Sequence, residues 1–173
     1  MRFSVAPILF RPGAPFKASR GRGVRNRLAF RVTAVQMLRK IGPGEGMAEI
    51  SAQSGEVLAA NEAFYQAFNQ RDLDLMATVW ASSNEVSCIH PGWNVLQGRE
   101  DVLESWRAIL TNPGQPRIVA GGASVAFVGA VALVLGRELV GGSPLVSTNL
   151  FVREGDAWKL LHHQSGPVYP PGG

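Results

Sequence analysis

Apolar residues recur at helical spacing over residues 56–110 and predict three amphipathic helices. The first is expected from Glu56 to Asn69, and Asp72 is placed to cap the second. The third is expected over Arg99–Leu110, ahead of a Pro113-Gly114 stop. The positions expected to face the core are Val57, Ala60, Phe64, Ala67, Phe68, Leu73, Met76, Ala77, Trp80, Val102, Leu103, Trp106, Ile109 and Leu110.

The pattern then changes to the alternation that is typical of strands. A short strand is expected at 85–90, and longer strands are expected from residue 117 onward. Gly121 and Gly122 interrupt the first long strand, so they predict a bulge or a sharp bend. Three further strands are expected at Val131–Val140, Leu145–Arg153 and Trp158–Ser165.

Helices followed by an antiparallel meander favour an α+β fold. We expect three helices packed on a strongly curved, mixed or antiparallel sheet, which together form a cone that encloses a pocket. The strand at Val131–Val140 is apolar on both faces except at Arg137 and Glu138. Such a strand is expected to be covered on both sides, which predicts a homodimer formed through the outer face of the sheet.

The final strand carries two of the three histidines at adjacent positions. Because successive side chains of a strand point to opposite faces, His162 and His163 are expected to diverge. Strict alternation would put His162 and Gln164 on the face of Trp158, and His163 on the other face. At most one of the two histidines can then enter a given pocket, although the pattern leaves open which one.

Composition and charge divide the chain in two. Ten of the 17 lysines and arginines lie within residues 1–46, against one acidic residue, while residues 47–173 hold seven basic and 12 acidic residues. We expect residues 1–46 to be a disordered basic extension and residues 47–173 to be the domain. The extension fits a basic arm, an organellar transit peptide, or a segment upstream of a true start at Met47. The acidic domain is not expected to bind nucleic acid.

Other compositional features narrow the class of protein. The hydrophobic fraction of 46% is that of a soluble globular protein, and no apolar run is long enough to cross a bilayer. The single cysteine, Cys88, excludes an internal disulfide and fits a reducing compartment. We therefore expect a cytoplasmic protein that does not associate with membranes.

Several stretches resemble the NTF2-like superfamily, and within it the bacterial SnoaL-like and ketosteroid-isomerase-like proteins. The similar stretches run from about Gly55 to Pro167. They are Phe-Tyr-Gln-Ala-Phe-Asn-Gln-Arg-Asp-Leu-Asp-Leu-Met from residue 64, His-Pro-Gly-Trp from residue 90, Gly-Arg-Glu-Asp-Val-Leu from residue 98, and Trp-Lys-Leu-Leu-His-His-Gln-Ser from residue 158. The resemblance implies a cone-shaped fold. It does not imply one activity, because the superfamily includes isomerases, dehydratases, cyclases, epoxide hydrolases, transport factors and association domains.

Steroid isomerisation needs a carboxylate base and a hydroxyl donor for the enolate oxygen. The resemblance aligns the family's tyrosine with Phe64, which has no hydroxyl, and Tyr65 is rotated by about 100° around the helix. The family's base aligns with Cys88 or, with a short gap, with His90. Neither is a carboxylate, so the chain is not expected to use that mechanism.

The catalytic candidates are His90, His162 and His163, since an imidazole titrates near neutrality and can act as a general base. Each could instead be a structural histidine. The residues expected to line a pocket or anchor a ligand are Tyr65, Trp93, Trp106, Arg137, Asn149 and Gln164. The aromatic residues among them could equally be plain core, and Arg137 could pair with Glu138 across strands. Adjacent strand residues diverge, so we expect neither a metal site nor a cofactor.

Two classes of function remain open from the sequence. The first is a small-molecule binder, or an acid–base enzyme of isomerase, dehydratase or cyclase type that acts on an apolar or polyketide-like ligand. The second is a non-catalytic, homo-oligomeric association domain, because the kinase association domains of the superfamily carry endings similar to His-His-Gln-Ser. An enclosed pocket with convergent polar groups would favour the first class, and a filled cone would favour the second.

Overall fold

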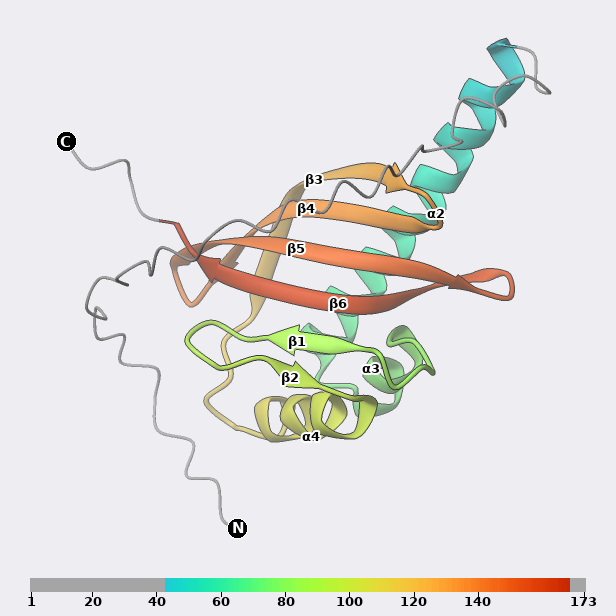
Figure 1. The fold of residues 1–173 in the computed structure, drawn as a ribbon. Helices are drawn as coiled ribbons and strands as arrows, with labels where there is room; N and C mark the ends of the chain where they lie inside the picture. The colour runs from blue at the N-terminus through green and yellow to red at the C-terminus, as the bar shows by residue number, and fades with distance from the viewer. Residues whose placement is uncertain (1–42, 169–173) are drawn as a thin grey trace, which may run out of the picture.

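The computed structural model describes residues 43–168, which form three helices and one six-stranded sheet (Figure 1). The predictions made for residues 1–42 lie outside this range. The elements in chain order are α2 (Pro43–Gln70), α3 (Leu73–Val79), β1 (Ser87–Ile89), β2 (Leu96–Gln97), α4 (Arg99–Leu110), β3 (Ile118–Val128), β4 (Val131–Val140), β5 (Ser143–Glu154) and β6 (Ala157–Pro167). The predicted α+β class is confirmed.

The sheet is mixed, with strand order β2-β1-β6-β5-β4-β3. Strands β3 to β6 form an antiparallel meander, and β1 joins β6 in parallel, with Cys88 opposite His163. Figure 1 shows α2 crossing one face of the meander, while α3 and α4 lie at the end of the sheet that carries β1 and β2. The helices therefore cover the inner face of a curved sheet, as the sequence predicts.

Helix α2 begins well before the predicted start at Glu56. Ser54, two residues before that start, lies within the helix and donates its hydroxyl to the carbonyl of Ile50 at 2.8 Å. Val57 is the first buried residue of α2, and the preceding turns extend past the edge strand β3 (Figure 1). Over residues 46–56 these turns contain no fully buried residue, and the alanine, glutamate and glutamine residues there favour a helix by propensity.

The core lies between α2, α3, α4 and the inner face of the sheet. Its largest fully buried side chains are Trp80, Phe64, Phe151, Met76 and Leu160. Trp106 joins them on α4 and lies edge-on to Phe64, with 5.4 Å between ring centroids. The helical stripe predicted from the sequence is therefore the stripe that is buried.

Two irregularities shape the long strands. The predicted break in β3 is confirmed as a register shift between Gly121 and Ser124, where Gly122 has a φ of +64°. Another register shift lies in β6, where Leu150 pairs with His162 and Phe151 pairs with Leu160. Leu161 is thus an extra residue, and the faces of β6 exchange at this bulge.

The bulge corrects the face assignment made from strict alternation. Leu160, His163 and Ser165 are buried and share the inner face, whereas Gln164 is exposed on the outer face. His163 is therefore the inward histidine of the pair.

Arg99 at the start of α4 is half-buried, whereas the next two residues, Glu100 and Asp101, are exposed. Its guanidinium donates to the carbonyls of Ala77, Trp80 and Ala81, at 2.8, 3.2 and 2.6 Å respectively. These carbonyls lie at the end of α3, where the helix leaves acceptors without intrahelical partners. Arg99 thereby fixes α4 against α3.

Candidate functional site

Polar side chains converge on the inner face of the sheet, where a core is ordinarily apolar. Glu138 of β4 is 4% exposed and accepts hydrogen bonds from Tyr65 Oη at 2.8 Å and from Ser165 Oγ at 2.6 Å. Tyr65 Oη also lies 3.2 Å from Ser147 Oγ. Burial and the nearby Glu138 charge raise the pKa of the Tyr65 phenol. The network joins α2 to β4, β5 and β6.

Glu138 and Arg137 are not the ion pair considered from the sequence. They are neighbours on β4, so Glu138 points inward and Arg137 is exposed. Within residues 43–168 the two ion pairs are Arg107–Glu104 and Arg153–Glu56. The buried Glu138 carboxyl is therefore held by neutral hydroxyls rather than by a cation in the described part of the chain.

A second network links α2, β5 and β6. Asn149 is 1% exposed and donates from Nδ2 to Asn61 Oδ1 at 2.7 Å. His163 Nδ1 lies 2.7 Å from Asn149 Oδ1, and because that oxygen can only accept, His163 carries its proton on Nδ1. Burial and the neighbouring His90 and His162 lower the pKa of His163 to about 3. His163 is therefore neutral near pH 7, and its Nε2 is an acceptor.

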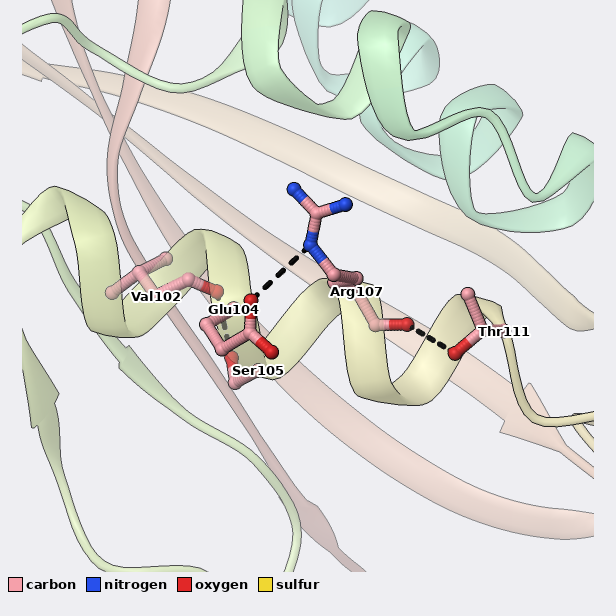
Figure 2. Close-up of polar contacts among 5 residues, drawn as sticks. All are labelled: Val102, Glu104, Ser105, Arg107 and Thr111. Atoms are coloured by element: carbon pink, nitrogen blue, oxygen red, sulfur yellow. Dashed lines mark hydrogen bonds and ion pairs between the residues drawn. The ribbon is translucent and has the colours of Figure 1, made fainter. Parts of the chain in front are cut away.

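His90 follows β1 and is buried beneath Trp93, with ring centroids 4.9 Å apart. Its Nε2 lies 2.9 Å from Ser105 Oγ, while the Ser105 hydroxyl donates to the Val102 carbonyl at 2.7 Å (Figure 2). Because that hydroxyl has a single hydrogen, His90 Nε2 must be the donor toward Ser105. Burial lowers the pKa of His90 to about 4.

Trp106 brings the two inward histidines together. Its ring centroid lies 4.5 Å from that of His90 and 5.8 Å from that of His163. The indole Nε1 is buried and has no hydrogen-bond partner among residues 43–168. Cys88 lies in the same cluster, with Sγ 3.8 Å from the His90 ring nitrogens, and burial raises the pKa of its thiol.

The remaining candidates lie elsewhere. His162 is half-buried on the opposite face from His163, and its Nδ1 is 2.8 Å from Ser87 Oγ. Burial lowers the pKa of His162. Trp93 is 39% exposed, and Gln164 points away from the interior because of the β6 bulge. Of the nine candidates, Tyr65, His90, Trp106, Asn149 and His163 come together inside the cone.

The interior leaves little free space beside these side chains. A hollow of about 10 Å³ lies between α2 and the β3 bulge, bordered by Asn61, Tyr65, Gly121, Gly136 and Ser147 among others. That volume is enough for about one water molecule. In the part of the chain that the structure describes, the cone is therefore largely filled by its own side chains.

A larger open region of about 460 Å³ lies along the exposed side of α4. It is bordered by Glu100, Asp101, Leu103, Glu104 and Arg107. All five come from one helix, and Figure 2 shows Glu104 and Arg107 paired to each other on this side, at 3.2 Å. With a single wall, this region is a helix surface rather than an enclosed site.

Within residues 43–168, no group of three or more His, Cys, Asp or Glu residues is arranged to hold a metal ion. In the same range, no helix is both long and apolar enough to cross a membrane.

Sequence reasoning did not find several members of the two networks. Asn61, Ser105, Ser147 and Ser165 are ordinary polar residues by type, and each becomes notable only because it is buried. A weak signal existed at residues 147, 149 and 151, since polar Ser147 and Asn149 alternate in phase with the buried Phe151.

Comparison with known proteins identifies the family. The profile of the SnoaL-like domain matches residues 57–170, and the chain belongs to this family. The match begins at Val57, the first buried residue of α2. The predicted membership of the NTF2-like superfamily, in its SnoaL-like branch, is confirmed.

Two similar solved structures carry different descriptions. A candidate dehydratase of the NTF2-like family from Streptomyces avermitilis is 34% identical, with a TM-score of 0.64 over 69% of this chain and 99% of that chain. A candidate calcium/calmodulin-dependent protein kinase type II association domain from Thiobacillus denitrificans is 31% identical, with a TM-score of 0.59 over 64% and 94%.

A plant protein is also similar. The F-box protein SKIP8 of Arabidopsis thaliana is 27% identical over 134 residues, which cover 72% of this chain and 55% of that protein. The chain thus spans about half the length of this relative.

Proposed function

We propose that this SnoaL-like domain is a homodimeric association module that pairs through the outer face of its sheet. The supporting observation is an apolar outer face that is open to solvent. Val119, Leu135, Leu139 and Val146 are 65%, 47%, 44% and 50% exposed on three neighbouring strands. Val119 pairs directly with Leu139, so these side chains form one patch. An exposed patch of this kind marks an interaction surface.

A second copy is the occupant that fits this patch best. In a two-fold dimer each subunit presents the same surface, so the apolar side chains of this patch can pack against those of a second copy. The interior adds support, because a cone whose free space is that of about one water molecule suits an association role. The 31% identical relative described as an association domain points the same way.

Sedimentation of the full chain tests this proposal. The wild type is expected to be a dimer at micromolar concentration, and Leu135→Glu with Leu139→Glu is expected to give a monomer. Val95→Glu is the matched control, since Val95 is 52% exposed near β2, away from the patch. A monomeric wild type, or equal dissociation in the control, would refute the proposal.

Small-molecule binding with acid–base chemistry is the second candidate function, and one observation favours it. The Trp106 Nε1–H is one of three buried indole donors without a partner in the described residues, and it is the one whose ring lies against two neutral imidazoles. Buried donors are rarely left unpaired, so a ligand acceptor such as a carbonyl oxygen would satisfy it. The 34% identical relative described as a candidate dehydratase is consistent with this role.

Native mass spectrometry of the full chain, purified gently from its own host, tests the second candidate. A copurifying molecule at one per subunit, lost on replacing His90 and His163 with alanine, is the expected result. An empty dimer would count against this candidate and in favour of association alone.

A further inference from the structure

The hollow beneath the β3 bulge is separate from the histidine cluster and has its own chemistry. It lies between α2 and the inner face of β3, β4 and β5, and it is partly open to solvent. Its polar walls are Asn61, Tyr65 and Ser147, and its volume of about 10 Å³ suits one group of the size of a water molecule.

Counting hydrogens fixes which atoms can face a ligand. The single phenolic hydrogen of Tyr65 is given to Glu138, so Ser147 donates its own hydrogen to Tyr65 Oη. Both oxygens keep lone pairs that no hydrogen of the network uses. The hollow is therefore bordered by two hydroxyl acceptors, which select a ligand group that donates hydrogen bonds.

The carboxylate of Glu138 lies behind the hollow, one hydrogen bond beyond the Tyr65 hydroxyl. Glu138 is buried, and hydroxyls from Tyr65 and Ser165 are its hydrogen-bond partners. A carboxylate buried without a cation is unfavourable, because neutral donors replace only part of its lost hydration. A positive group in the hollow would compensate the Glu138 charge across the Tyr65 hydroxyl. The attraction between the two charges would be only weakly screened there.

The β3 bulge leaves a way out for the rest of such a ligand. The bordering residues on this strand are Ala120, Gly121 and Ala123, none of which carries a long side chain. A substituent on the bound group can pass over them to solvent.

We propose that the hollow binds the protonated amino group of a small primary amine, which donates to Tyr65 and Ser147 with Glu138 as the counter-charge. The ammonium group matches the size of the space, the acceptor atoms on its walls and the buried charge behind them. This site neither requires nor follows from the dimer proposed above.

Calorimetric titration of the full chain with methylammonium chloride tests the proposal, with tetramethylammonium chloride at equal ionic strength as the control ligand. Methylammonium is expected to bind, and tetramethylammonium, which lacks N–H donors and is larger, is not. Glu138→Gln keeps the shape of the side chain and is expected to weaken methylammonium at least tenfold. Arg137→Gln alters a side chain on the outer face of β4 and is expected to bind methylammonium about as the wild type does.

A pair of glycine variants covers the case in which Glu138→Gln does not fold. A Cβ at Gly136 would lie 3.2 Å from Ser147 Oγ, so Gly136→Ala should crowd the hollow and weaken binding. A Cβ at Gly166 of β6 meets no atom within 4 Å, so Gly166→Ala should bind as the wild type does.

Three results would overturn the proposal. They are equal affinity for the two ammonium ions, no change in Glu138→Gln, and equal affinity in the two glycine variants. Retained binding in the Leu135→Glu and Leu139→Glu variant would keep the site separate from dimerisation.

Discussion

Both faces of strands β4, β5 and β6 depart in part from the usual alternation of apolar and polar residues. The inner face is buried, yet it carries Glu138, Ser147, Asn149, His163 and Ser165. The outer face is open to solvent on β4 and β5, yet it presents Leu135, Leu139 and Val146. In an ordinary two-layer domain, alternation along a strand puts the apolar residues inside and the polar residues outside.

The inner face combines two kinds of stabilising contact. Helix side chains such as Phe64 and Trp106 pack with strand side chains such as Phe151 and Leu160, and polar residues of the sheet add hydrogen bonds. Substitutions of the inner polar residues should therefore act through unpaired polar groups, while substitutions on the outer face should act through association.

The largest expected effect is at Asn149. Asn149→Ala leaves His163 Nδ1 and Asn61 Oδ1 without their buried partners, and each such loss is typically worth about 1–3 kcal/mol. We expect urea unfolding to report a stability lower by about 2–5 kcal/mol. Thr148→Ala, one residue away on the outer side of β5, should change stability by less than about 0.5 kcal/mol. Equal losses would show that the two faces do not differ.

Acidification should produce the next largest effect. The pKa of His90 falls from an unfolded value of about 6.5 to about 4 in the folded protein. Between these values the unfolded chain binds more protons, so stability is full above pH 6.5 and falls as the pH is lowered toward 4. The loss from this one group should be on the order of 3 kcal/mol.

Unfolding measured across this pH range should show a smaller slope in His90→Gln. His162→Gln is the control, because His162 is only half-buried and should contribute less. An unchanged slope in His90→Gln would mean that His90 is not the group that resists protonation.

The smallest effect on the subunit itself should come from the outer face. Leu135→Thr replaces a half-exposed side chain and should shift the stability of a monomer by less than about 0.5 kcal/mol. In a dimer the melting temperature rises with protein concentration, and Leu135→Thr should flatten this dependence. Calorimetric scans of the wild type, Leu135→Thr and the control Val95→Thr at two protein concentrations measure this dependence.

The sequence predicts the elements of this fold well wherever burial follows a regular period. Local pattern predicts helices α3 and α4 and the strand order of the meander. It also predicts the Asp72 cap, in which Asp72 Oδ1 accepts from the Leu75 amide at 2.8 Å. The β3 bulge was predictable because Gly122 occupies a left-handed conformation that favours glycine.

The sequence does not predict features that depend on tertiary contacts. The β6 bulge has no glycine to mark it, because Leu161 is an ordinary strand residue. Its effect is to put Leu160 and His163, which strict alternation assigns to opposite faces, on the same inner face. The Glu138 network joins residues more than 70 positions apart, from Tyr65 to Glu138 and Ser147. The types of these residues alone do not indicate that their side chains are in contact.

The parallel pairing of β1 with β6 sets the order in which the molecule can be completed. Strands β3 to β6 join through short turns, so they can pair as each one emerges from the ribosome. Strand β1 is made long before them, yet its partner on β6 spans residues 162–164. Cys88 and Ile89 therefore lack their β6 partners until nearly the whole domain has been translated. The interval between the synthesis of residue 89 and that of residue 164 is the period in which a nascent chain of this protein most needs protection from aggregation.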